Sequence, residues 1–234
     1  MRYFAKITTT FALALVFTAG VAFGQTAETD NELQIEQAGD KNFTNVEQAG
    51  QNNFSNVDLL GPKGDARVFQ TGDDNSAFTE ADGGVTLRQV QEGNDNYART
   101  GTPGGGAVLT QKSVARQEQV GDNNTAVMTF DGPGTRRAKF KQRQIGNNNE
   151  SYLLGFSSDS DYAFEGLTNQ VGNDNLVRVN SPAAGGSGDE RNSVRAVQMG
   201  DMNTIRGTFE SRSNRAVVTQ DGSSNVAKFT QSGN

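Results

Sequence analysis

Residues 214–234 read NRAVVTQDGSSNVAKFTQSGN, and they contain one phrase, Gln-x-Gly-x-x-Asn, followed by its first half again. Gln220, Gly222 and Asn225 form the complete copy, and Gln231 and Gly233 begin the next one. Self-similarity at a fixed period is the sequence signature of a repeat architecture. The phrase therefore raises the question of how often it recurs along the chain.

Nine complete copies of the phrase occur between residues 37 and 225. In the sequence numbering, the intervals from each Gln to the next, ending at Gln231, are 11, 22, 21, 28, 25, 26, 28, 22 and 11. A unit of about 11 residues divides into a strand of about seven and a turn of about four. The copies, each given by its Gln, Gly and Asn, are Gln37, Gly39, Asn42; Gln48, Gly50, Asn53; Gln70, Gly72, Asn75; Gln91, Gly93, Asn96; Gln119, Gly121, Asn124; Gln144, Gly146, Asn149; Gln170, Gly172, Asn175; Gln198, Gly200, Asn203; and Gln220, Gly222, Asn225.

The residues around each copy alternate in character with period two, as in a strand that has one buried face. Before Gln198, for example, every second position holds Ala196, Val194 or Asn192, whereas Arg195 lies between them. No Asp, Glu, Lys or Arg falls in this frame, although 21% of the chain is charged. Besides the recurring Gln and Asn, the frame collects Leu33, Ile35, Thr44, Val46, Val57, Ala66, Val68, Ala77, Leu87, Ala98, Ala115, Ala126, Met128, Phe140, Leu153, Val177, Val179, Val194, Ala196, Ile205, Phe209, Ala216, Val218, Ala227 and Phe229.

These patterns predict an all-β fold, because frequent Gly and Asn and a period of two disfavour helices. We expect a β-solenoid over residues 31–234, with strand-turn-strand coils of about 22 residues stacked in an amyloid-like cross-β arrangement. Gly/Pro/Ser-rich inserts at 101–106, 131–134 and 181–187 fall on the connection opposite the repeated turn. One edge should therefore keep a fixed turn while the other tolerates loops.

The recurring amides are expected to lie inside the coils, where an unpaired amide is costly. Stacked at roughly 4.8 Å, equivalent Gln or Asn side chains can hydrogen-bond along the axis. The Gly residues would supply the positive-φ backbone of the turn. The alternative interpretation of these amides as ordinary surface residues does not explain why they keep phase with an apolar set.

Two other kinds of site could be built from these residues. The Asp/Asn/Gly turns could suit calcium, but calcium-binding solenoids repeat Gly-Gly-x-Gly-x-Asp, and the Asn here is a weaker ligand than a carboxylate. The basic run 136–143 could bind phosphate or lipopolysaccharide, although stacking would place Arg143 near Glu118 and Lys139 near Glu165 in structural ion pairs. The outward aromatic residues could serve adhesion or lateral bundling. The sequence predicts no catalytic, cofactor or metal site.

Residues 1–24 have the pattern of a secretory signal peptide. Arg2 and Lys6 precede an apolar run from Phe11 to Val21, and Ala22-Phe23-Gly24 suits cleavage after Gly24. Residues 25–30 would form a short N-terminal segment. Removing the signal changes the formal net charge from -6 to -8, which argues against nucleic-acid binding. We expect a secreted protein without stable membrane insertion.

Residue content narrows the function classes further. The chain has no His and no Cys, so it lacks the commonest general base and the thiolate metal ligand. An enzyme that cleaves polysaccharide on a parallel β-helix would need clustered carboxylates or a cation site, and no such constellation occurs. The chain is therefore predicted not to be an enzyme.

The repeated phrase resembles the curlin repeat of bacterial curli fibres. The best matches are Gln220-Asp-Gly222-Ser-Ser-Asn225-Val-Ala227 with Gln231, and Gln37-Ala-Gly39-Asp-Lys-Asn42 with Gln48. The resemblance covers about residues 31–234. In most copies the second Gln of the family's repeat is replaced, by Leu59, Ala81, Phe130, Gly155, Ser181 and Phe209.

The resemblance implies a subunit of an extracellular functional amyloid that serves cell-surface adhesion and the biofilm matrix. It also implies export through dedicated machinery and nucleation by a companion subunit, and it leaves open whether this chain is the major subunit or the nucleator. The uncapped last strand predicts head-to-tail self-assembly. The alternative is a monomeric secreted β-solenoid that binds a surface ligand such as a polysaccharide or ice.

Overall fold

The structure is a computed structural model, and it describes residues 15–16, 21–26, 30–37, 41–59, 64–80, 86–101, 114–131, 139–156, 163–181, 191–211 and 213–232. Within these residues all regular structure is β-strand, arranged in two parallel sheets. The nine-stranded sheet contains β2 (Val21–Thr26), β4 (Phe43–Ala49), β6 (Ala66–Thr71), β8 (Leu87–Glu92), β10 (Val114–Val120), β12 (Lys139–Ile145), β14 (Ala163–Val171), β16 (Arg191–Met199) and β18 (Arg215–Asp221). The ten-stranded sheet contains β1 (Leu15–Val16), β3 (Glu32–Gln37), β5 (Phe54–Val57), β7 (Ser76–Thr79), β9 (Tyr97–Arg99), β11 (Thr125–Asp131), β13 (Glu150–Phe156), β15 (Leu176–Ser181), β17 (Thr204–Phe209) and β19 (Val226–Gln231).

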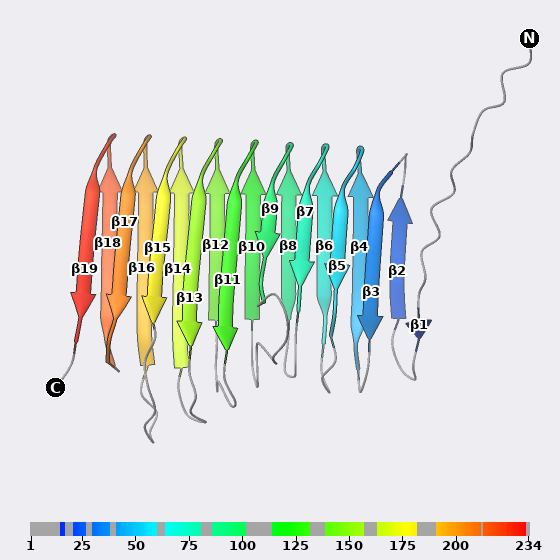
Figure 1. Ribbon diagram of the computed structural model, residues 1–234, viewed down its shortest axis with the longest axis horizontal. Helices are drawn as coiled ribbons and strands as arrows, with labels where there is room; N and C mark the ends of the chain where they lie inside the picture. Colours follow the sequence, from blue (N-terminus) through cyan, green and yellow to red (C-terminus); the bar gives the residue numbers. More distant parts are fainter. Residues whose placement is uncertain are drawn as a thin grey trace, which may run out of the picture.

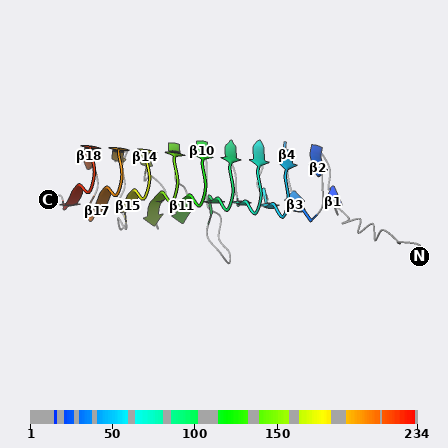
Figure 2. The same ribbon diagram turned by 90° about the horizontal axis from the view of Figure 1, so that it is seen from above.

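The chain alternates between the two sheets, so one strand from each sheet and the turn between them make a coil (Figure 1). Seen from above, the two sheets face each other as two layers (Figure 2). The predicted all-β solenoid is confirmed. Equivalent residues of neighbouring coils are 21 to 28 positions apart, so the expected length of about 22 residues holds only for the shorter coils.

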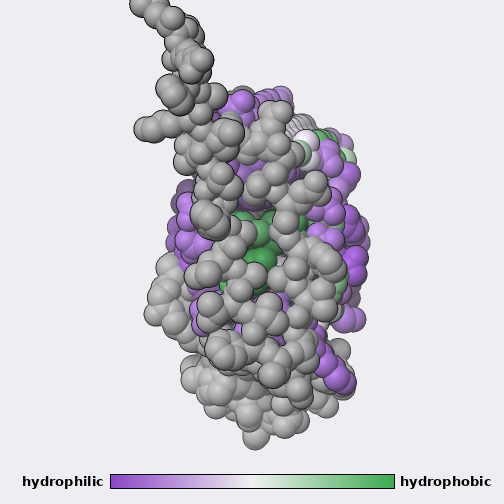
Figure 3. Space-filling model, turned by 90° about the vertical axis from the view of Figure 1, so that its right-hand side faces the viewer, coloured by the Kyte–Doolittle hydropathy of each residue, from purple (hydrophilic) through white to green (hydrophobic). Residues whose placement is uncertain are grey.

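The predicted inside and outside are also confirmed. Of the recurring amides that the structure describes, Asn225 and Gln231 are partly buried. All other members of the predicted inward set are buried except Leu33, Ile35, Val218, Ala227 and Phe229, which are partly buried. Those five lie in β3, β18 and β19, at the two ends of the stack. Viewed from the N-terminal end, a hydrophobic patch is visible in the middle, with hydrophilic side chains on either side (Figure 3).

The interior is narrow, so large side chains need a small neighbour in the next coil. Phe140 in β12 is level with Gly166 in β14. At the C-terminal end, Gly207 is level with Phe229, whose ring occupies the space where a Cβ of Gly207 would lie. The Phe229 ring also contacts the Phe209 ring, with centroids 5.6 Å apart. Close packing therefore depends on which residues are level, not only on which face inward.

The repeated turn has one backbone conformation in every described copy. Its Gly residues have φ between 99° and 115°, and the residue two positions later has φ between 54° and 60°. Asn or Asp fills that second position in most copies, because these side chains tolerate the left-handed region. From Gly50 to Gly200, an added Cβ would lie 2.1 to 2.3 Å from the carbonyl oxygen of the next turn. The Gly is therefore required both for its φ and for the close approach of stacked turns.

Strand β2 spans the predicted cleavage point after Gly24 and pairs with β4, so that Thr26 is level with Gln48. Strand β1 pairs with Glu36 and Gln37 of β3. A chain cleaved after Gly24 would lose β1 and keep only Gln25 and Thr26 of β2, which would uncover the outer edge of β3. Cleavage stays a prediction, and most of the three predicted inserts lies outside the described residues.

The close approach of the turns can be tested with two glycines. Gly121→Ala would place a Cβ 2.3 Å from the Gly146 oxygen, whereas in Gly222→Ala the nearest atom is 3.6 Å away. Both variants carry the strain of a positive φ, so their difference measures the clash. We expect Gly121→Ala to lower the free energy of unfolding by about 1–3 kcal/mol more than Gly222→Ala in urea denaturation. Equal losses would show that the turns are not tightly stacked.

Candidate functional site: the stacked amide ladders

Eight of the recurring Gln side chains form one hydrogen-bonded column inside the solenoid. Each Nε2 donates to the Oε1 of the Gln in the following coil, over 2.9 to 3.0 Å. All eight are buried, with at most 7% of the residue surface exposed. The column consists of Gln48, Gln70, Gln91, Gln119, Gln144, Gln170, Gln198 and Gln220.

The same amide groups also hold each coil together. Gln119 Nε2 donates to the carbonyl oxygen of Asn124, which closes its own turn, and to that of Tyr97 in the preceding coil. Both contacts recur at Gln48, Gln70, Gln91, Gln144 and Gln170. A buried amide is tolerated when its donors and acceptor are paired, so the column couples the turn, the strand and the neighbouring coil.

The recurring Asn side chains form a second column, at the end of the turn, with the opposite donor direction. Each Nδ2 donates to the Oδ1 of the Asn in the preceding coil, over 3.0 to 3.1 Å. From Asn53 to Asn203, Nδ2 also donates to the Gly carbonyl of the following turn, over 2.7 Å. The three residue types of the phrase are therefore joined in one network along the axis.

The residue after each Gly adds a third set of contacts. The Oδ1 atoms of Asp73, Asn94, Asp122, Asn147, Asn173 and Asp201 accept the backbone N–H of the equivalent residue in the preceding turn, over 2.8 to 2.9 Å. This explains why Asp and Asn recur at this position. Within the described residues, no group of three or more Asp or Glu side chains is placed to hold a metal ion.

Three predicted ladder residues lie elsewhere. Gln37 and Gln231 end β3 and β19 in the ten-stranded sheet, and Asn42 follows on the edge opposite the repeated turns. Gln37 Nε2 donates to Thr44 Oγ1 (2.7 Å), and Gln231 Nε2 donates to the Arg215 carbonyl (3.1 Å). The copies at each end of the chain are separated by only 11 residues. This interval is half a coil, so Gln37 and Gln231 lie in the sheet opposite to the other Gln residues of the phrase. Gly39 lies outside the described residues.

Sequence reasoning missed two sets of ladder residues. Asn31 begins the Asn column: its Oδ1 accepts the Asn53 backbone N–H, and its Nδ2 donates to the Gly50 carbonyl. A second Gln column runs from Gln89 through Gln117 to Gln142, over 2.8 and 3.0 Å. These Gln residues stand two positions before the Gln of the phrase, a spacing that could have revealed them. Asn31 has no Gln-x-Gly before it, so a search for the repeated phrase could not have revealed it.

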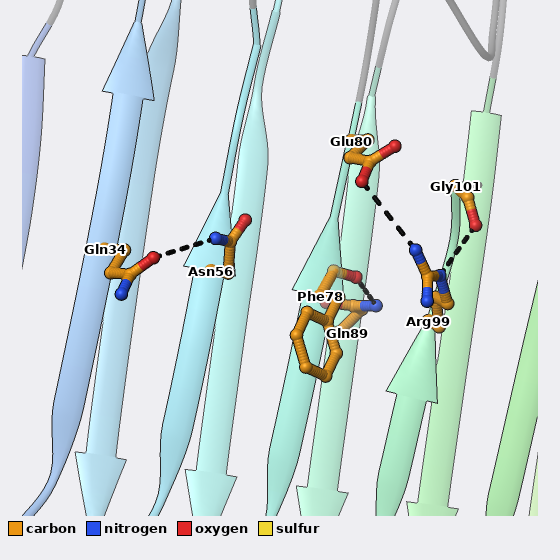
Figure 4. Close-up of polar contacts among 7 residues, drawn as sticks. All are labelled: Gln34, Asn56, Phe78, Glu80, Gln89, Arg99 and Gly101. Carbon is orange, nitrogen blue, oxygen red and sulfur yellow. Dashed lines mark hydrogen bonds and ion pairs between the residues drawn. The ribbon is translucent and has the colours of Figure 1, made fainter. Parts of the chain in front are cut away.

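The outer faces carry ion pairs and short polar contacts. Arg143 Nε lies 3.5 Å from Glu118 Oε1, and Lys139 is level with Glu165, as the stacking predicted. On the ten-stranded sheet, Asn56 donates to Gln34, and Arg99 lies between the Glu80 carboxylate (3.8 Å) and the Gly101 carbonyl (2.9 Å) (Figure 4). Exposed pairs of this kind contribute little to stability.

The outward aromatic residues are half-buried. On the ten-stranded sheet, Phe78 contacts Phe54 and Tyr97, with ring centroids 5.1 and 5.6 Å apart. On the nine-stranded sheet, Phe43 and Phe69 lie under the guanidinium groups of Arg67 and Arg88. Much of the aromatic surface is therefore covered by neighbours within the chain.

Three carboxylates gather near the loop edge of the ten-stranded sheet. Burial, together with the negative charges of the nearby Glu36 and Glu80, raises the pKa of Asp58 to about 6. Burial also raises the pKa of Glu80, against the lowering effect of Arg99. Asp58 Oδ1 has no hydrogen-bond partner. Ionised Asp58 therefore destabilises the folded chain at neutral pH.

The fold and these columns define the class of structure: a two-sheet parallel β-solenoid with internal amide ladders. Comparison with models of known protein families, with curated proteins and with solved structures returned no match. The resemblance to curlins therefore rests on the repeated phrase itself. Among the described residues there is no helix of the length and apolarity needed to cross a membrane.

Replacing an internal member of the Gln column should lower the free energy of unfolding far more than replacing an exposed Gln. Gln119→Ala would leave the buried Gln144 Oε1 without its donor, at about 1–3 kcal/mol for the unpaired group, whereas Gln91 Nε2 would keep its two carbonyl acceptors. Gln34→Ala, on the outer face, should change the free energy of unfolding by less than about 0.5 kcal/mol. Chemical denaturation of both variants provides the measurement. Similar values for the two would contradict a structural role for the column.

The raised pKa of Asp58 predicts a pH dependence. Because the folded chain binds the proton more tightly than the unfolded chain does, Asp58 makes stability rise as pH falls from about 7 towards 4. Asp58→Asn should be more stable than the wild type at pH 7 and should show a smaller gain over that window. Glu47→Gln, at an exposed position on β4, serves as the control for loss of one charge. Thermal melts at pH 4, 5, 6 and 7 measure both, and an unchanged slope in Asp58→Asn would contradict the assignment.

Proposed function

We propose that the mature chain is a structural subunit of an extracellular, curli-like amyloid fibre that assembles head to tail. The observation that carries this proposal is the state of the two ends of the solenoid. Strands β18 and β19 end their sheets, and the inward-facing Val218, Ala227 and Phe229 are only partly buried there. An end of this kind presents apolar surface and unpaired backbone groups, which another strand can cover.

The opposite end would offer the matching surface after removal of the signal segment. Loss of β1 would uncover β3, whose inward-facing Leu33 and Ile35 are also partly buried. Stacking β3 of one copy on β19 of the next then places apolar residues over apolar residues. The head-to-tail contact would continue the ten-stranded sheet with the packing already present between coils, whereas the nine-stranded sheet would be continued next to β18 only by Gln25 and Thr26, which remain of β2.

The Asn column sets the register of this contact. Asn31 begins the column and Asn225 ends it, so a continuous column places Asn31 of one copy over Asn225 of the next. The same register places Gln37 over Gln231, since both lie six residues after their Asn. Gln231 Oε1 is buried and has no hydrogen-bond partner, and an amide from Gln37 would supply a donor. The two Gln residues that lie outside the main column thus meet at the junction.

Other parts of the proposal follow from the resemblance to curlins. They are secretion guided by residues 1–24, export through dedicated machinery, and nucleation by a companion subunit. The fibre would serve cell-surface adhesion and the biofilm matrix. Head-to-tail stacking suits both a major subunit and a nucleator, since each must offer an open end.

Assembly of residues 25–234 tests the proposal. Thioflavin fluorescence, electron microscopy and fibre diffraction should show unbranched fibres with a reflection at about 4.7–4.8 Å. A chain that stays monomeric for days under these conditions would contradict head-to-tail assembly.

A pair of variants on β19 tests the junction itself. Ala227→Lys places a charge on the inward face of the last strand, where it remains partly exposed in the monomer but would be buried by the next copy. Thr230→Lys places the same side chain on the exposed outer face. We expect both monomers to keep the wild-type circular dichroism spectrum, and elongation to fall at least tenfold in Ala227→Lys only. Equal elongation by the two variants would exclude β19 as the growing edge.

A further inference from the structure

The outer face of the nine-stranded sheet carries four cations in one row. Arg88 pairs in register with Arg116, and Arg116 pairs with Lys141. Arg67 stands one position before Val68, which pairs with Gln89, so it is level with Arg88. The row therefore crosses β6, β8, β10 and β12, with one positive charge per strand spacing of about 4.8 Å.

Level residues of like charge repel each other across a sheet, and the row is only partly compensated. Asp65 lies 3.2 Å from Arg67, and Glu118 lies 3.0 Å from Arg116. Within the described residues, neither Arg88 nor Lys141 forms an ion pair. Phe43 and Phe69 lie beneath the first two guanidinium groups, with centroids 5.7 and 6.0 Å away, and so hold them over the sheet.

Two further cations flank the row on β12, and the row is interrupted at β14. Lys139 and Arg143 lie on the same face as Lys141, two residues before and after it. In β14 the row is interrupted by Leu167, which is level with Lys141. The row and its two neighbours on β12 contain six cations; Asp65 contacts Arg67, Glu118 contacts Arg116 and Arg143, and Glu165 in β14 is level with Lys139. A local positive strip therefore lies on a chain whose net charge is negative.

We propose that this cation row binds a linear acidic polysaccharide of the polyuronate type. An extended 1,4-linked polyuronate carries one carboxylate per sugar ring, and its rise per ring is close to the strand spacing of about 4.8 Å. In a two-fold extended chain the carboxylates of alternate rings lie on the same side, so they can meet cations that stand two strands apart, such as Arg88 and Lys141. Three of the four cations in the row are Arg, the side chain best suited to paired hydrogen bonds with carboxylates.

Nucleic acid fits the row less well. Phosphates along one strand of a duplex repeat about every 3.4 Å, which does not match the spacing of the cations.

Polyuronate binding needs only one copy of the protein, because the row lies within a single solenoid. The inference is therefore independent of fibre assembly.

Binding of polygalacturonate to the full mature chain, measured by interferometry before assembly begins, tests the row. Arg88→Gln/Lys141→Gln removes two cations that form no ion pair with the part of the chain that the structure describes. It should weaken binding at least tenfold and reduce the slope of log Kd against log salt by about two, one for each cation. The control, Arg215→Gln/Lys228→Gln, makes the same charge change at exposed positions of β18 and β19, outside the row, and should leave both quantities nearly unchanged.

Circular dichroism and melting curves establish that both double variants are folded. If the control variant weakened polygalacturonate binding equally, binding would depend only on the net charge of the protein, and the proposal would be overturned. It would also be overturned by equal binding of methyl-esterified polygalacturonate, which lacks the carboxylates. Tighter binding of single-stranded poly(dT) than of polygalacturonate would assign the row to nucleic acid instead.

Discussion

The structure depends on the hydrogen bond between equivalent side-chain amides of neighbouring coils. A Gln buried between two sheets, away from water, needs a donor and an acceptor within reach. The next coil supplies both only if it carries an amide at the same level. In-register stacking is thus a condition for burying the polar half of this interior, and 33% hydrophobic content suffices because apolar groups fill only the other half.

This constraint explains the other regular features of the molecule. Coils spaced for amide contact also bring their turns within reach, so the turn needs a Gly where the next carbonyl approaches and a residue that accepts a positive φ two positions later. At the loop edge the described residues form no such column, and the coils differ in length from 21 to 28 residues without loss of register. The outer faces make no contribution to the ladders. They can therefore carry the cation row and the three carboxylates Glu36, Asp58 and Glu80.

The inside and outside of the solenoid could be predicted from sequence, because the charged residues keep strictly to alternate positions. The main Gln and Asn columns could be predicted because both residues recur in a fixed phrase. Asn31 could not be found that way, since it takes the place of the phrase's Asn without the Gln and Gly before it. Gln37 and Gln231 match the phrase, yet the half-coil interval places them in the other sheet. The cation row depends on the level of each strand relative to its neighbours, which the unequal inserts hide in the sequence.

Side-chain amide exchange tests the central claim most directly. In the folded mature chain labelled with ¹⁵N-glutamine, the amide protons of the internal column members Gln70 to Gln198 should exchange with solvent only as fast as the coils open. Those of the exposed Gln34 should exchange at the rate of a free side chain. Fast exchange at Gln119, in the middle of the column, would show that its amide faces water and would contradict the stacked ladder on which the fold, the junction and the turn geometry depend.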